Sequence, residues 1–77
     1  MKHFLDFVVR SLVDNPDDIQ ITEKSGAGET VYRVSLHPSD VGLVIGKGGR
    51  TIGSIRSLIN TATKSGDRLA VEVVENS

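Results

Sequence analysis

Residues 44–52, which read VIGKGGRTI, constrain the fold more than any other stretch of the chain. Three glycines within four residues separate two segments whose branched aliphatic residues recur at helical spacing. Glycine adopts backbone angles that other residues avoid, and it has no side chain to hold a ligand away. A helix that follows such a loop turns its free N–H groups and the positive end of its dipole toward a ligand bound at the loop. Lys47 and Arg50 add positive charge beside this position. The stretch predicts a phosphate-binding loop between two helices; the plainer alternative is a turn without a ligand.

The first half of the chain predicts a helix followed by a β-hairpin. Apolar residues recur near the 3.6-residue period over residues 3–13, and Asn15-Pro16 ends this helix. Alternating residues predict strands at 19–24 and 30–37, joined by a glycine-rich turn at 25–28. The inward-facing residues expected of the helix and the second strand are Phe4, Leu5, Val8, Val9, Leu12, Val13, Tyr32, Val34 and Leu36.

The second half predicts two helices and a last strand. A short helix covers residues 40–45, with Ser39 or Asp40 as its cap, and a longer one runs from Arg50 to Lys64. Residues 65–67 close the longer helix, and a strand follows at residues 69–74. The apolar stripes of these two elements consist of Ile52, Ile55, Ile59 and Ala62, and of Leu69, Val71 and Val73.

The order of these elements, α-β-β-α-α-β, predicts an α+β fold. Two helices between the second and third strands allow a parallel pairing with a right-handed crossover. We therefore expect a three-stranded sheet with the helices packed on one face, in a single domain spanning residues 1–77. A chain this small buries only about 60% of its unfolded surface. With 38% apolar and 4% aromatic residues, its core consists mainly of Val, Ile and Leu.

Positive charge is concentrated around the glycine loop. The net charge is −1 and the pI about 6.0, which argues against a general polyanion binder. Residues 1–40 carry four cations and seven acids, a balance of −3, whereas residues 41–68 carry five cations and one acid, a balance of +4. The cations beyond the loop are Arg56, Lys64 and Arg68. Each alone suits a solvated surface, but together they favour contact with a nucleic-acid backbone.

Several other kinds of site are excluded or disfavoured. The chain has no cysteine, and His3 and His37 are not spaced as metal ligands, so we expect no metal site. Residues 42–48 lack the spacing of a Walker loop, and Thr51 stands where a dinucleotide-binding motif requires its third glycine. We expect no catalytic residue and no cofactor. The N-terminal apolar run is interrupted by Asp6 and Arg10, so we expect no membrane segment and a cytoplasmic location.

The loop resembles that of KH domains, whose signature is I-G-x-x-G-x-x-I between two helices. Residues 45–52, IGKGGRTI, match it at every defined position, and the element order looks like the type II, mainly bacterial, version. The resemblance extends over nearly the whole chain to small bacterial single-KH proteins of the KhpA type, through LVDNPD at residues 12–17 and SDVGLVIGKGGRTI at residues 39–52. It implies that single-stranded RNA binds at the loop and in an adjacent groove. The residues implied are Val44, Ile45, Gly46, Lys47, Gly48, Gly49, Arg50 and Ile52; which of the aliphatic ones line the groove and which lie in the core stays open. The concentration of positive charge adds Arg56 to the expected RNA-binding residues.

The same resemblance implies association between chains. KhpA-type proteins form homodimers, partner a larger KH protein of the Jag type, and are linked to RNA regulation, cell elongation and division. The side of the helix at 50–64 away from its stripe carries small residues and one leucine, which would let a second helix approach closely: Gly53, Ser54, Ser57, Leu58 and Thr61. An ordinary solvated surface is the alternative there. For the whole chain, the alternative is a KH-fold protein-interaction module with little RNA binding.

Overall fold

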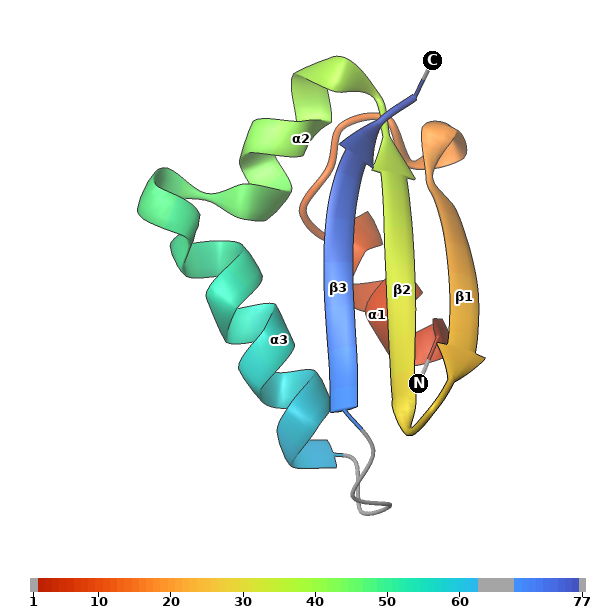
Figure 1. Cartoon of the computed structure of the whole chain (residues 1–77). Helices are drawn as coiled ribbons and strands as arrows, with labels where there is room; N and C mark the ends of the chain where they lie inside the picture. Colours follow the sequence, from red (N-terminus) through yellow and green to blue (C-terminus); the bar gives the residue numbers. More distant parts are fainter. Residues whose placement is uncertain (1, 63–67, 77) are drawn as a thin grey trace.

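The computed structural model describes residues 2–62 and 68–76, and the expected element order α-β-β-α-α-β is confirmed (Figure 1). Two short 3₁₀ turns, η1 and η2, supplement the regular elements. In chain order the elements are α1 (Lys2–Arg10), η1 (Pro16–Asp18), β1 (Gln20–Gly26), β2 (Glu29–Leu36), α2 (Pro38–Ile45), η2 (Lys47–Gly49), α3 (Arg50–Ala62) and β3 (Arg68–Glu75). The predicted end of the long helix at Lys64 and the closing turn at 65–67 lie outside the described residues.

The three strands form one mixed sheet in the order β1-β2-β3. β1 and β2 are antiparallel, with Ile21 opposite Val34, and β2 and β3 are parallel, with Val34 opposite Val73. The parallel pairing was predicted and follows from the two helices that join β2 to β3 (Figure 1). Both β1 and β3 are therefore edge strands.

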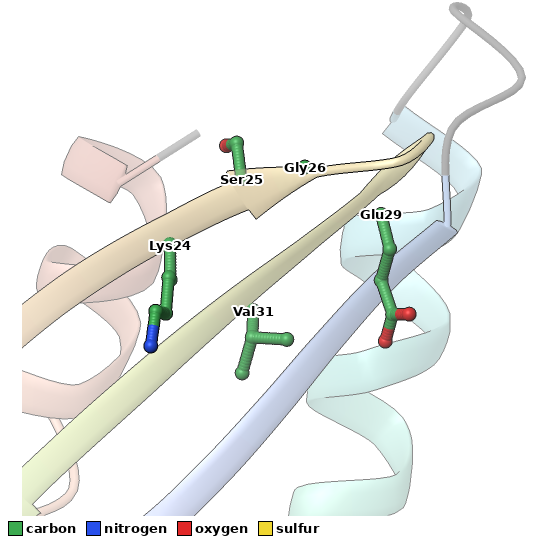
Figure 2. Close-up of a pocket in the computed structure, with 5 residues that line it drawn as sticks. All are labelled: Lys24, Ser25, Gly26, Glu29 and Val31. Atoms are coloured by element: carbon green, nitrogen blue, oxygen red, sulfur yellow. The ribbon is translucent and has the colours of Figure 1, made fainter.

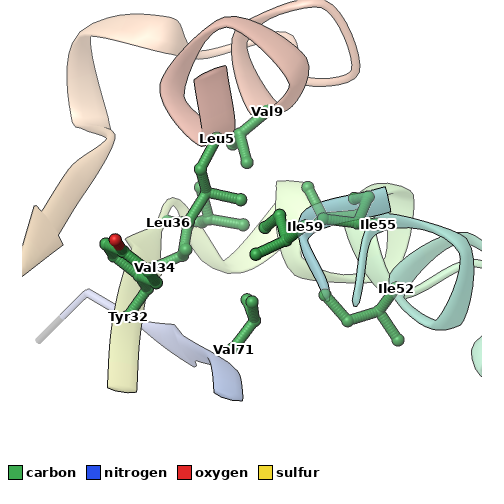
Figure 3. Packing of buried hydrophobic residues seen from close by; sticks show 10 residues of the cluster. Leu5, Val9, Tyr32, Val34, Leu36, Ile52, Ile55, Ile59 and Val71 are labelled. Carbon is green, nitrogen blue, oxygen red and sulfur yellow. The ribbon is translucent and has the colours of Figure 1, made fainter. Parts of the chain in front are cut away.

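The core lies between one face of the sheet and all three helices. Tyr32, Val34 and Leu36 alternate along β2 and are buried on the same side, as predicted. Figure 3 shows side chains of α1 and α3 converging on those of β2 and β3. The buried cluster consists of Leu5, Val9, Tyr32, Val34, Leu36, Val44, Ile52, Ile55, Ile59 and Val71. This aliphatic core on one face confirms the expected α+β architecture.

The prediction for the first helix was wrong at its end and on one face. α1 stops at Arg10 rather than residue 13, and the Leu12 N–H bonds to the Val9 carbonyl at 3.0 Å, which is a tight 3₁₀-type last turn. Phe4, placed in the core stripe from its spacing, is 42% exposed, and Phe7 is 72% exposed. Helical spacing identified the core side through Leu5 and Val9 but made the buried stripe too wide.

The hairpin turn is tighter than expected. β1 continues to Gly26, which pairs with Glu29, so that Ala27 and Gly28 alone form the connection. Both have positive φ, 50° and 76°, as a type I′ turn requires. The predicted turn at residues 25–28 was too long because the strand pairing continues through the glycine.

The cap of α2 is His37, so the predicted cap at Ser39 or Asp40 was wrong. The His37 Nδ1 accepts a hydrogen bond from the Ser39 N–H at 3.1 Å, which satisfies a free donor of the first turn. Pro38 occupies the first helical position, where the missing N–H costs nothing.

Asp40 instead joins α2 to the segment that follows α1. Its side chain is 1% exposed and accepts hydrogen bonds from the backbone N–H of Asp14 at 3.2 Å and of Asn15 at 2.9 Å. The Asn15 side chain adds a third bond at 3.1 Å. Because these donors are drawn to the carboxylate, the chain leaves the helical path before Pro16.

The pKa of Asp40 lies below its ordinary value. Burial acts to raise this pKa, but the hydrogen bonds from Asn15 and the backbone of Asp14, together with nearby His37, lower it by more. The carboxylate form is thus favoured in the folded chain. Its contribution to stability is complete above the unfolded pKa, roughly 3.9, and is lost as the pH falls through the lower folded pKa.

We predict that Asp40→Asn lowers the melting temperature by several degrees at neutral pH. An amide has one acceptor and places its own donors against those of Asn15. Thermal unfolding followed by circular dichroism from pH 7 to about 2.5 measures the difference, which should shrink below roughly pH 4 as the parent's Asp40 becomes protonated. Asp17→Asn, at an exposed acid, is the control. A difference that stays constant with pH would contradict this role of the carboxylate.

Candidate nucleic-acid interface

The glycine loop has a backbone that only glycines adopt without strain. Gly46 ends α2 with φ 75° and ψ 170°, Gly48 has φ 65° and ψ 18°, and Gly49 has φ 78°. Between Gly46 and Gly49 the chain makes a single 3₁₀ turn and enters α3 at Arg50. The sequence-based expectation of a tight glycine loop between two helices is confirmed.

The glycines of the loop have different steric tasks. A Cβ atom on Gly46 would overlap the Thr51 hydroxyl and lie 2.8 Å from the Thr51 Cβ atom, so a side chain there would push the loop away from α3. Cβ atoms on Gly48 or Gly49 would meet nothing within 4 Å. Gly46 therefore allows close packing against α3, whereas Gly48 and Gly49 leave the outer surface of the loop bare.

The tip of the loop presents free backbone donors. The N–H of Gly46 bonds to the Gly42 carbonyl at 2.9 Å, and that of Gly49 bonds to the Gly46 carbonyl at 3.1 Å. The Arg50 N–H bonds to the Lys47 carbonyl. Within the described ranges, the N–H groups of Lys47 and Gly48 have no acceptor, and both residues are exposed. Two adjacent free N–H groups at the start of a helix form a concave site that suits an anion.

The two cations of the loop differ from Arg10 and Arg33, which are paired with carboxylates. Arg10 pairs with Asp6 at 2.7 Å, and Arg33 pairs with Glu72 at 3.2 Å. Lys47 and Arg50 are exposed, and neither lies within 4.0 Å of a carboxylate in the part of the chain that the structure describes. Their charge is available to a ligand.

The aliphatic residues around the loop divide between core and surface. Val44 is fully buried and Ile52 is 7% exposed, so both pack in the core. Ile45 is only partly buried and packs against that core from the side. Of these three, Ile45 has the most side-chain surface left for a ligand, a distinction that sequence alone left open.

Arg56 lies away from the loop, beside the outer edge of β3. Six residues of helix separate it from Arg50, roughly 9 Å along the axis. Its Nη2 donates to the backbone carbonyl of Val71 at 2.9 Å. Sequence analysis placed Arg56 with the RNA-binding residues but had no signal for this link between α3 and the strand, because the partner is a backbone atom.

The outer side of α3 is largely exposed, and two of its hydroxyls donate to carbonyls within the helix. Ser54 donates to the Arg50 carbonyl at 3.1 Å, and Thr61 donates to the Ser57 carbonyl at 2.8 Å. Leu58 is 54% exposed, and Gly53 is partly buried. This side therefore carries short side chains and one larger apolar side chain, that of Leu58.

Two cavities lie elsewhere in the molecule. One, of 290 Å³, opens at the hairpin end of the sheet beside Lys24, Glu29 and Val31 (Figure 2). The other, of 380 Å³, lies between α1 and β1 and is lined by Lys2, His3, Asp6 and Ile21. Neither is lined by a residue of the glycine loop. Within residues 2–62 and 68–76, no group of His, Asp and Glu side chains is arranged to hold a metal ion, and no helix is long and apolar enough to cross a membrane.

A family model and several curated relatives match nearly the whole chain. The family model described as KhpA/KhpB, KH domain, matches residues 2–73. The chain is 38% identical over 76 residues to an RNA-binding protein KhpA of Chlamydia pneumoniae, covering 97% of each chain. It is 42% identical over 72 residues to that of Leifsonia xyli subsp. xyli, covering 94% of this chain and 93% of the relative. The KhpA of Clostridium acetobutylicum is 39% identical over 75 residues, covering 96% of this chain and 100% of the relative. No solved structure matches significantly. The chain belongs to the KhpA/KhpB family of KH-domain proteins.

Proposed function

We propose that this protein binds single-stranded RNA, with the glycine loop holding the phosphate backbone. The observation that carries the proposal is the bare loop tip. There the N–H groups of Lys47 and Gly48, which have no acceptor among the described residues, lie beside two cations that have no carboxylate partner among those residues. The relatives' description as RNA-binding proteins supports the same activity.

Each part of the site has a distinct role in this proposal. The N–H groups and the positive end of α3 bind a phosphate, and Lys47 and Arg50 add charge attraction. Absence of side chains at Gly48 and Gly49 lets the nucleotide backbone lie against the loop, over about four nucleotides. Bases then lie over Ile45 toward Arg56 and the edge of β3, while Val44 and Ile52 fix the two helices from the core.

We further propose that two chains associate through the outer side of α3, the surface formed by Gly53, Ser54, Ser57, Leu58 and Thr61. One loop contacts few nucleotides, and a second chain raises the effective concentration of binding sites. Ser54 and Thr61 satisfy their hydroxyls within the helix, so burying them leaves no unpaired donor. In a two-fold arrangement Leu58 would meet the same surface of the partner copy.

The family resemblance also suggests a location, a cellular role and a second partner for the protein. We place the protein in the cytoplasm as a non-enzymatic regulator of RNA, linked to cell elongation and division, with a Jag-type KH protein as a second partner. These roles rest on the resemblance.

We predict that changing Lys47 and Gly48 both to Asp abolishes RNA binding and leaves the fold intact. Two carboxylates at the loop repel phosphate, and Asp tolerates the φ of 65° at position 48 better than most residues. The double variant Lys24→Asp/Gly28→Asp is a matched control, because Lys24 is exposed and Gly28 has φ 76° with open space around it. Fluorescence anisotropy with single-stranded RNA and circular dichroism are the measurements. A folded loop variant that binds like the control would remove the loop from the site.

We predict a shallow salt dependence of RNA binding. Two to four phosphate contacts give a slope of log affinity against log salt of about −1.4 to −2.8, at roughly −0.7 per contact for a single strand. Titrations over a range of potassium chloride concentrations measure this slope. A much steeper slope would mean that the footprint on the RNA backbone is larger than the loop and its neighbours.

We predict that Leu58→Asp yields a folded monomer with weakened RNA binding. The side chain is 54% exposed, so the fold tolerates the charge, but a two-fold interface would bury two carboxylates. Sedimentation velocity of parent and variant at equal concentration measures the change. Leu43→Asp, at an exposed leucine of α2, is the control. A monomeric parent, or a variant that dimerises as the parent does, rules out this side of α3.

A further inference from the structure

We propose that the outer side of α1 is a second contact surface for single-stranded RNA, on which bases stack against Phe4 and Phe7. This surface is separate from the glycine loop and lengthens the stretch of RNA that one chain contacts. The inference rests on the proposed RNA binding at the loop.

The two phenylalanines expose most of the aromatic surface of the chain. Phe4 is 42% exposed and Phe7 is 72% exposed, whereas Tyr32, the third and last aromatic residue, is 4% exposed. Residues three apart on a helix have Cβ atoms roughly 5–6 Å apart, so the rings are neighbours. An isolated exposed apolar residue is ordinary, but adjacent exposed rings on one helix form a flat surface of the kind on which bases stack.

The charge around these rings suits a polyanion. α1 carries Lys2 and Arg10 against Asp6, a balance of +1, whereas residues 11–40 carry two cations and six acids, a balance of −4. Because Arg10 pairs with Asp6 at 2.7 Å, Lys2 is the source of the positive balance of α1. Within the acidic first half of the chain, α1 is therefore the positive segment. It packs against α3, which begins with Arg50 at the glycine loop, so both positive segments belong to the helical layer.

The 380 Å³ cavity borders the same surface. Lys2, His3 and Asp6 line it from α1, and Ile21 lines it from β1. His3 lies four residues before Phe7, a spacing that makes two side chains neighbours on a helix, so the cavity adjoins the aromatic pair. A cavity of this size falls within the range of small-ligand sites, roughly 300–1,000 Å³. It offers Lys2 and His3 as donors to a phosphate or to a base edge beside the rings.

The size of the apolar surface favours a nucleobase over a second protein chain. An aromatic side chain has a surface of roughly 150–250 Å². With 42% of Phe4 and 72% of Phe7 exposed, the two rings together expose about 170–280 Å². A stable protein interface needs about 800 Å² from each partner. One or two planar bases match the available area, and the charge of Lys2 suits the RNA backbone.

The test compares two substitutions at Phe7 on RNAs of two lengths. Phe7→Leu keeps an apolar side chain but removes the ring, whereas Phe7→Tyr keeps the ring; both leave the core unchanged because the side chain is 72% exposed. The probes are fluorescently labelled single-stranded RNAs of about five and about 15 nucleotides. The shorter RNA is just long enough for the loop, which contacts about four nucleotides. Sedimentation velocity of each variant without RNA is measured in parallel.

We expect Phe7→Leu to weaken binding of the longer RNA by about five- to 100-fold, the effect of losing one base stack, without changing binding of the shorter one. Phe7→Tyr should bind both RNAs as the parent does. Equal binding of the longer RNA by Phe7→Leu and parent overturns the inference and leaves the loop proposal standing. An altered sedimentation coefficient with unchanged RNA affinity also overturns it, because the surface would then join copies of the chain. If the parent binds neither RNA, the proposed function itself fails.

Discussion

The close approach of Gly46 to Thr51 determines how the two central helices meet. With φ at 75°, Gly46 ends α2 and turns the chain, and the space that a Cβ atom would need is taken by the Thr51 side chain. α3 begins four residues later, so the intervening loop is short, and its N–H groups at Lys47 and Gly48 have no acceptor within the described part of the chain. The local chemistry of the loop is thus a consequence of helix packing.

The other end of α2 is fixed by contacts from a distant part of the sequence. His37 caps the helix, and Asp40 binds the backbone of residues 14 and 15 while buried beneath them. A helix held at its start by a buried carboxylate and at its end by Gly46 has little freedom to shift. The loop is therefore presented in a fixed orientation, which reduces the entropy lost when a ligand binds.

The distribution of charge separates two kinds of surface. Arg33 on the sheet pairs with Glu72, and Arg10 at the end of α1 pairs with Asp6. Lys47 and Arg50 have none among the described residues, and Arg56 donates to a neutral carbonyl. A chain with net charge −1 can thus present a locally positive surface, because its acids lie mainly in the first 40 residues.

The order of the elements and the position of the glycine loop could be predicted from the sequence alone, and the sequence allowed the parallel pairing of β2 with β3. These follow from short-range rules: periodicity within an element, the length of a crossover, and the backbone freedom of glycine. Tertiary structure alone decided the end of α1, the cap of α2, the exposure of Phe4 and the bond from Arg56 to Val71. The bond from Arg56 depends on a backbone carbonyl 15 residues away, and the width of the buried stripe of α1 depends on which neighbours cover it. The end of α1 and the cap of α2 depend on which atom reaches a free backbone donor once the chain has folded. Local pattern contains no information about such partners, so only the folded chain could reveal them.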